Sequence, residues 1–181
     1  MIIIGLGNKD KNFENTRHNV GYKFIDYLIT QNSTQYLPNA NILEYNKYSL
    51  SFVAKVSINN NDVLLFKPVC YMNESGDVVK MIMKFYKKSV DEICIVHDDL
   101  DIELGKYVIQ VGKGPHTHNG LNDIEQKIGM NFMRLRIGIE NREIPRIPGG
   151  EYVLQNFSIE ENNRLTSVFQ TVYENISKII K

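Results

Sequence analysis

The sequence has little cysteine, no excess of charge of either sign and no long hydrophobic run. Its two cysteines, Cys70 and Cys94, are isolated and lack CxxC spacing, which argues against a disulfide framework or a cysteine zinc site. Basic and acidic residues balance at 21 each, so a nucleic-acid partner would have to be held by local basic patches. No segment approaches the roughly 20 apolar residues of a membrane span, and the opening MIII is too short for a signal peptide. These absences predict a cytoplasmic protein without a membrane partner.

The residues that are present are typical of an ordinary globular protein. A chain of 181 residues, 43% hydrophobic and 23% charged, can bury a substantial core without disulfides or metal ions to stabilise it. The sequence shows no internal repeat, and its one linker-like stretch, Asn141 to Gly150, is predicted to be a mobile surface loop. We therefore predict a single domain over residues 1–181, with a monomer as the default state.

Strand-like and helix-like segments alternate along the chain. Apolar runs and alternating patterns predict strands, and apolar positions at a period of 3.6 residues predict helices. The expected strands cover residues 1–6, 48–58, 63–66, 92–96, 106–111 and 132–139, and the expected helices 20–31, 73–86, 121–128 and 159–179. A turn at Asn59 to Asp62 makes a hairpin of the second and third strands. This order predicts an α/β fold with three layers, in which helices flank a mixed, mostly parallel twisted sheet.

Polar clusters follow the expected strands or precede the expected helices. Ligands of α/β sheets bind beyond the carboxyl ends of the strands, so such clusters are candidates for one common site. This topology can bring five residues to the rim of the sheet at the carboxyl ends of its strands. They are Asn8, His18, Asn73, Asp98 and Asn119. Their convergence is the strongest indication of a functional site that the residues give by themselves.

Each cluster also has other interpretations. "GLGNKD" has two of the three glycines of a dinucleotide-binding fingerprint but lacks the third. "HDDLD", with His116 and His118, could hold the metal of a metal-dependent hydrolase, although an aspartate cluster after a strand is also a common turn and helix cap. "NESGD" lacks the GxSxG spacing of a serine nucleophile, and Cys70 at a strand end is typical of a packed hydrophobe. A histidine at a helix start, such as His18, is either catalytic or simply exposed.

Six blocks of sequence together resemble one known family. They are "GLGN" at 5–8, "NTRHNVGY" at 15–22, "KPVCYMNESG" at 67–76, "VHDDLDIELGK" at 96–106, "HNGLNDI" at 118–124 and "FMRLRIGI" at 132–139. In order and spacing they are similar to the signature blocks of bacterial peptidyl-tRNA hydrolases, over residues 1 to about 157. The resemblance implies an esterase that cleaves the bond between a peptide and the 3′-terminal ribose of tRNA, and so recycles prematurely released peptidyl-tRNA.

The resemblance also implies roles for individual residues. His18 matches the catalytic histidine and Asp98 its supporting aspartate, while Asn8 matches the asparagine that helps reject unblocked aminoacyl-tRNA. The residues that match contacts to the acceptor end and the substrate backbone are Phe13, Tyr71, Asn73 and Asn119, and Met72 and His118 would line the same cleft. No metal or cofactor is implied.

The chemistry of these residue types agrees with that assignment. A histidine has an ordinary pKa near 6.5, so it can take a proton from water at neutral pH, and a carboxylate can fix its tautomer. Asparagine amides can donate hydrogen bonds to a developing oxyanion without adding charge. An acyl-enzyme route would need a nucleophile, and no Ser or Cys stands in a recognised activating pattern.

The sequence departs from the family pattern where tRNA phosphates are expected to bind. Val108 and Gln110 stand where basic residues are common, which shifts the expected phosphate clamp to Lys106, Lys113 and Arg136. Phe13 replaces the usual tyrosine, and Cys70 the usual threonine or serine. Two other functions therefore stay open: an RNA-binding module without turnover, and a metal-dependent phosphoesterase.

Overall fold

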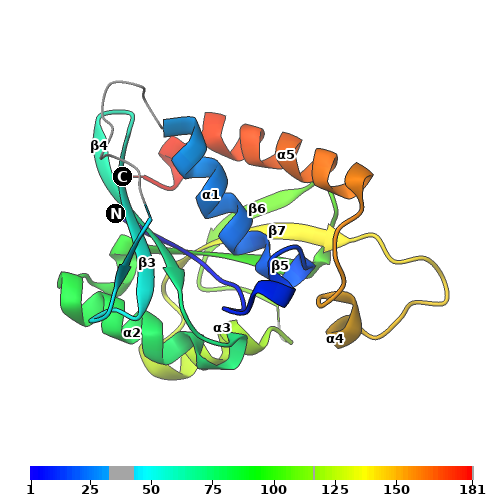
Figure 1. The fold of residues 1–181 in the computed structure, drawn as a ribbon, viewed down its shortest axis with the longest axis horizontal. Coiled ribbons are helices and arrows are strands. Elements are labelled where there is room, and N and C mark those ends of the chain that lie inside the picture. Colours follow the sequence, from blue (N-terminus) through cyan, green and yellow to red (C-terminus); the bar gives the residue numbers. More distant parts are fainter. Residues whose placement is uncertain (33–42, 116, 181) are drawn as a thin grey trace.

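The computed structural model describes residues 1–32, 43–115 and 117–180, which form one seven-stranded sheet with helices on both faces (Figure 1). The strands are β1 (Ile2–Gly5), β2 (Glu44–Asn46), β3 (Ser51–Ile58), β4 (Asn61–Pro68), β5 (Ile93–Glu103), β6 (Tyr107–Val111) and β7 (Met133–Glu140). They lie in the order β2-β3-β4-β1-β5-β7-β6. The four strands β4, β1, β5 and β7 are parallel, and antiparallel pairing is confined to the two edges. The predicted mixed α/β sheet is confirmed.

Helices cover each face of this sheet over a separate hydrophobic layer. They are α1 (Val20–Asn32), α2 (Ser75–Tyr86), α3 (Asn119–Ile128), the short α4 (Gly149–Tyr152) and α5 (Ile159–Glu174). On the face of α1 and α5, Phe24 and Phe169 meet edge to face with ring centroids 5.2 Å apart. On the face of α2 and α3, Phe66 and Phe132 are fully buried. The three predicted layers are therefore present.

Two glycines let α1 begin in direct contact with the centre of the sheet. A Cβ atom on Gly21 would lie 2.4 Å from the backbone nitrogen of Leu6 and 2.5 Å from the carbonyl oxygen of Val96. A Cβ atom on Gly5 would lie 2.3 Å from the carbonyl oxygen of Gly21. Any side chain at these positions would push the helix away from β1. The close approach sets the residues just before α1 over the end of the sheet.

The predicted hairpin is formed by β3 and β4. Its turn residues, Asn59 and Asn60, both have positive φ values, of 50° and 63°. Such a turn matches the twist of the flanking strands, and asparagine tolerates it better than most residues. The turn is narrower than predicted, because Asn61 and Asp62 already pair with β3.

Several predicted bounds differ from the structure. For example, β3 begins at Ser51 and not at residue 48, and α4 begins at Gly149, within the predicted loop. β5 does not end at Val96 but continues to Glu103, because β7 pairs with it beyond that point, with Asp98 opposite Ile137. The three-residue edge strand β2 has too little pattern to be recognised in the sequence. The last helix ends at Glu174, and a 3₁₀ turn follows at Ile176–Lys178.

Within the described residues, every helix is too short or too polar to cross a lipid bilayer.

Candidate active site

Asp98 lies within β5 and accepts hydrogen bonds from two histidines. Its Oδ1 atom is 2.8 Å from Nδ1 of His18 and 3.1 Å from Nε2 of His118. All three residues are buried, although they come from three separate segments of the chain. The ring centroids of His18 and His118 are 4.9 Å apart, and the two rings are tilted by 46°. A single carboxylate oxygen thus organises both imidazoles.

The partners of each ring assign its tautomer. Nδ1 of His118 accepts the backbone N–H of Leu121 at 3.2 Å, as the cap of α3, so the proton of the neutral ring is on Nε2 and points at Asp98. His18 also donates to Asp98, through Nδ1. Nε2 of His18 therefore keeps its lone pair, which is the form that a general base needs.

The site shifts the pKa values of its members in opposite directions. Burial raises the pKa of Asp98, but the neighbouring His18 and His118 lower it more and hold it well below its usual range. Burial lowers the pKa of His18, yet the charge of Asp98 and the hydrogen bond to it leave that pKa above 6.5. Burial, together with the nearby His118, lowers the pKa of His97 to about 3. His97 is therefore a neutral, buried ring, and its Nδ1 lies 2.7 Å from the carbonyl oxygen of Asp98.

His18 is held in place by its own backbone. It lies in a 3₁₀ turn, Arg17–Asn19, directly before α1, and its N–H donates to the carbonyl oxygen of Val153 at 2.8 Å. The N–H of Arg17 likewise donates to the carbonyl oxygen of Gln155 at 3.0 Å. The turn is therefore tied to the segment that follows α4, which is far away in the sequence.

Arg17 strengthens the same connection and faces away from the cleft. Its Nη2 atom bonds both carboxylate oxygens of Glu161, at 2.9 and 2.7 Å, and the pair is almost entirely buried. The guanidinium lies 3.9 Å from the ring centroid of Tyr152. Glu161 also closes the cap of α5 by accepting the N–H of Ser158 at 2.8 Å. Arg17 thus joins the turn that carries His18 to α5.

Replacing Arg17 by methionine is expected to lower the free energy of unfolding by about 3 kcal/mol, because it leaves Glu161 buried without its partner. Chemical denaturation of the variant and the wild type measures this difference. The double variant Arg17→Met, Glu161→Gln is the control, and it should regain part of the loss. Equal stability of the single variant and the wild type would contradict a structural role for Arg17.

A pair of asparagines joins the end of β1 to this turn. The N–H of Asn8 donates to Oδ1 of Asn19 at 2.9 Å, and Nδ2 of Asn19 donates to the carbonyl oxygen of Asn8 at 3.0 Å. Oδ1 of Asn8 accepts the N–H of Met72 at 2.9 Å. With its oxygen bound in this way, Asn8 has its amide N–H groups left to offer to a ligand.

A cleft of about 280 Å³ opens beside His18 and Asp98. Its other walls come from β5, from the start of α3 and the segment before it, and from α4 and the residue after it. These residues are Leu100, Asp101, Pro115, Thr117, His118, Asn119, Gly149, Gly150 and Val153. The predicted residues His18, Asp98 and Asn119 thus meet in one cleft. The sequence did not reveal Gly149 and Gly150, whose only signal was a glycine pair after a proline.

The other predicted residues, Asn8, Phe13, Tyr71 and Asn73, do not line this cleft. Asn73 is exposed on the 3₁₀ turn Met72–Glu74, next to the residue that Asn8 holds. Tyr71 is 41% exposed, and its hydroxyl donates to Asp10 at 2.8 Å. Phe13 is half-buried in the 3₁₀ turn Lys11–Phe13.

The predicted metal cluster is only partly assembled. Asp99 does not reach the site, because Nε of Arg136 binds its Oδ2 atom at 2.6 Å, and His116 is outside the described residues. The ligand atoms of His18, Asp98 and His118 do lie within 4.8 Å of one another, and residues of these types can hold a cation. Their separations of 2.8 and 3.1 Å are equally those of hydrogen bonds.

The predicted phosphate clamp is not a free basic cluster. Arg136 is paired with the buried Asp99, and Nζ of Lys106 lies 2.6 Å from Glu103. Lys113 is exposed. Two of the three side chains therefore already have acidic partners.

Comparisons with known proteins agree on one family. The family model described as peptidyl-tRNA hydrolase matches residues 2–181. The chain belongs to the peptidyl-tRNA hydrolase family. It is 36% identical to the peptidyl-tRNA hydrolase of Lawsonia intracellularis, over 99% of this chain and 87% of that protein. It is 41% identical to the Francisella tularensis enzyme of that name, over 92% of this chain and 83% of the relative.

A solved structure shows that the family fold is shared. The crystal structure of peptidyl-tRNA hydrolase from Acinetobacter baumannii superposes with a TM-score of 0.84 at 32% identity, over 97% of this chain and 86% of that one. The resemblance drawn from the six sequence blocks is therefore confirmed. As a member of the peptidyl-tRNA hydrolase family, the protein is a hydrolase.

Proposed function

We propose that the protein hydrolyses the ester between the peptide and the 3′-terminal ribose of peptidyl-tRNA, in the cytoplasm, with His18 as the general base. The observation that carries this proposal is the hydrogen bond of 2.8 Å between His18 and Asp98 at the wall of the cleft. It leaves Nε2 of His18 as the proton acceptor. Membership of the family gives the substrate class.

The reaction needs one water molecule and one base. Nε2 of His18 takes a proton from water as the water oxygen attacks the ester carbonyl, and Asp98 stabilises the imidazolium that forms. When the tetrahedral intermediate collapses, the bond from carbon to the ribose oxygen breaks. The imidazolium then returns its proton to that oxygen. The products are a free peptide acid and a tRNA with an intact 3′ hydroxyl.

Asparagines are the groups best suited to stabilise the developing oxyanion. Asn119 lines the cleft, Asn8 accepts the N–H of Met72, and Asn73 follows Met72 in the chain. A preorganised amide donor of this kind is worth about 3–4 kcal/mol in the transition state. Asn8 and Asn119 bind the substrate backbone in this proposal, and Asn73, Phe13 and Tyr71 contact the acceptor end of the tRNA.

A second candidate, a metal-dependent hydrolase, rests on the cluster of His18, Asp98 and His118. An assay of peptidyl-tRNA hydrolysis with and without a strong chelator distinguishes this candidate from the proposed metal-independent mechanism. The proposed mechanism gives full turnover after dialysis against the chelator. Turnover that is lost with the chelator and regained with a divalent cation would identify a metal enzyme, and RNA binding without any turnover would identify a binding module.

A further inference from the structure

The carboxylate of Asp98 and the two imidazoles that it binds are also a set of metal ligands. The ligand atoms of His18, Asp98 and His118 lie within 4.8 Å of one another, and all three residues are buried. Two imidazole nitrogens and one carboxylate oxygen are donors that Zn²⁺ commonly takes in proteins. They suit Mg²⁺ and Ca²⁺ poorly, because these cations prefer sites made of oxygen atoms. The set therefore favours zinc.

The spacing of the three ligand atoms is close to that of a zinc site. Oδ1 of Asp98 lies 2.8 Å from Nδ1 of His18 and 3.1 Å from Nε2 of His118. Bonds of about 2.0–2.2 Å to a tetrahedral zinc ion place its ligand atoms roughly 3.4 Å apart. The two separations therefore have to widen by only a few tenths of an ångström. The ion takes the place of the two protons that lie between the rings and the carboxylate.

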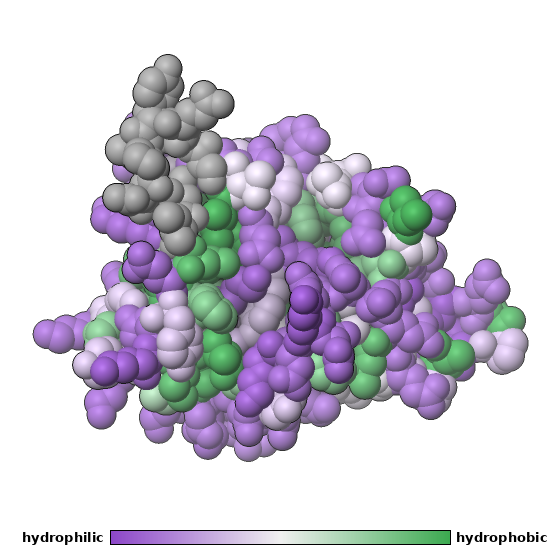
Figure 2. Space-filling view, viewed as in Figure 1, coloured by the Kyte–Doolittle hydropathy of each residue, from purple (hydrophilic) through white to green (hydrophobic). Residues whose placement is uncertain are grey.

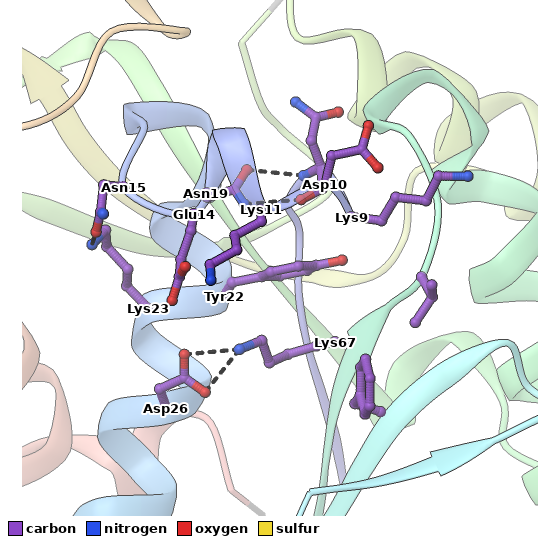
Figure 3. Close-up of a pocket in the computed structure, with 13 residues that line it drawn as sticks. Lys9, Asp10, Lys11, Glu14, Asn15, Asn19, Tyr22, Lys23, Asp26 and Lys67 are labelled. Carbon is purple, nitrogen blue, oxygen red and sulfur yellow. Dashed lines mark hydrogen bonds and ion pairs between the residues drawn. The ribbon is translucent and has the colours of Figure 1, made fainter.

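Other acidic side chains of the described residues offer weaker sites for a cation. Hydrophilic side chains cover most of the face shown in Figure 2, and an exposed carboxylate there is already hydrated. Asp10, Glu14 and Asp26 line a second cavity, of about 340 Å³, but lysines stand among them, and Lys67 binds Asp26 at 2.8 Å (Figure 3). Within the part of the chain that the structure describes, the two histidines and Asp98 are the only group arranged to hold a metal ion.

A zinc ion at Nδ1 of His18 changes the tautomer of that ring. A neutral imidazole carries one proton, and Nδ1 carries it while it donates to Asp98. A metal binds the lone pair of an unprotonated nitrogen, so the proton has to be on Nε2 when zinc is on Nδ1. Nε2 then donates a hydrogen bond and no longer takes a proton from water. The number of protons on the ring stays the same.

His118 exchanges its proton in the same way. Its Nδ1 atom accepts the backbone N–H of Leu121 at 3.2 Å. With zinc on Nε2, the proton of the ring moves to Nδ1 and this hydrogen bond is lost. One neutral hydrogen bond is much weaker than a bond to zinc, so the cap of α3 does not prevent binding.

A metal in this position lies away from the reacting ester. Nδ1 and Nε2 point in different directions across the ring of His18, and the proposed mechanism has the water and the ester carbonyl beside Nε2. The Nδ1 side faces Asp98, whose side chain is only 3% exposed. Zinc held there removes the base without bringing a metal-bound water to the ester.

We propose that His18, Asp98 and His118 bind one Zn²⁺ ion, which reversibly inhibits the enzyme by keeping a proton on Nε2 of His18. The inhibition rests on the proposed function, because it requires His18 to be the base. The binding of zinc does not depend on that role. The metal thus regulates the site and takes no part in the reaction, and its removal restores activity.

The first experiment measures zinc binding by the protein without substrate. Zinc sulfate is titrated in competition with a chromophoric chelator, and one equivalent is expected to bind. His18→Ala and His118→Gln should each weaken binding by at least about 10-fold, because each removes a ligand. The double variant Cys70→Ala, Cys94→Ala is the matched control, since it removes both thiols and should bind zinc like the wild type. No binding, or equal affinity in all variants, would overturn the inference.

Nitrogen NMR of the imidazole rings follows the tautomer of His18 directly. One equivalent of zinc is expected to move the proton of this ring from Nδ1 to Nε2. A ring that keeps its proton on Nδ1 with zinc bound would also overturn the inference.

Kinetics on peptidyl-tRNA separate this inference from the proposed function. Saturating zinc is expected to lower kcat by about 10²- to 10⁴-fold, the loss expected on removal of the base, and EDTA to restore it. The same amount of additional Mg²⁺ is the control and should leave kcat unchanged. Full turnover with zinc bound would overturn the inference and leave the proposed function standing. Turnover that rises with zinc would also overturn it and identify a metal enzyme. Zinc bound to His18 in a protein without turnover would support the metal site and reject the hydrolase.

Discussion

Replacing His18 by alanine is expected to lower kcat for peptidyl-tRNA hydrolysis by about 10²- to 10⁴-fold, the usual worth of a positioned base. In the proposed mechanism the imidazole accepts the proton of the attacking water through its Nε2 atom. Single-turnover measurements on the variant and the wild type give the chemical step directly.

The design of this experiment must separate catalysis from folding and binding. The affinity for tRNA should change little, because the proposed role of His18 is to act on the attacking water. The melting temperature reports on the turn, whose backbone bonds from Arg17 and His18 remain in the variant. A folded His18→Ala protein with near wild-type kcat would rule out His18 as the base.

The sequence predicted the centre of the fold well because its signals are local. The run Ile2 to Ile4 is hydrophobic throughout, as a strand buried on both faces requires, and it is fully buried. The paired asparagines Asn59 and Asn60 marked the hairpin turn. The prediction of strand ends from apolar runs failed where a strand contains polar residues. Asp98 looked like the start of a loop, yet β5 continues through it. There β5 pairs with β7, and His18 and His118 satisfy the buried carboxylate.

The interactions that position the site are long-range, and a single sequence does not show them. Arg17 and Glu161 are 144 positions apart, so nothing near Arg17 predicted that it would join the turn that carries His18 to α5. The tautomer of His118 depends on its role as the cap of α3, which was not anticipated. The six blocks gave the family, whereas the geometry supplied the connections among their residues.

Replacing Asp98 by alanine is expected to lower the rate less than His18→Ala does, by about 10²-fold, because Asp98 supports the base without being the base. The pH dependence carries the sharper prediction. In the wild type the pKa of His18 is above 6.5, and the base works only when it is deprotonated, so activity rises with pH through that pKa.

Removing the carboxylate deletes both influences that raise the pKa of His18 and leaves the burial that lowers it. The acid limb of the profile of kcat/KM against pH should therefore move to lower pH in Asp98→Ala, while the plateau falls. A variant of Asp101, whose carboxylate is at the rim of the same cleft, is the matched control and should keep the limb in place. An acid limb that stays where it is in Asp98→Ala would mean that the limb reports a group other than His18. A larger loss of rate than in His18→Ala would reverse the roles of the two residues.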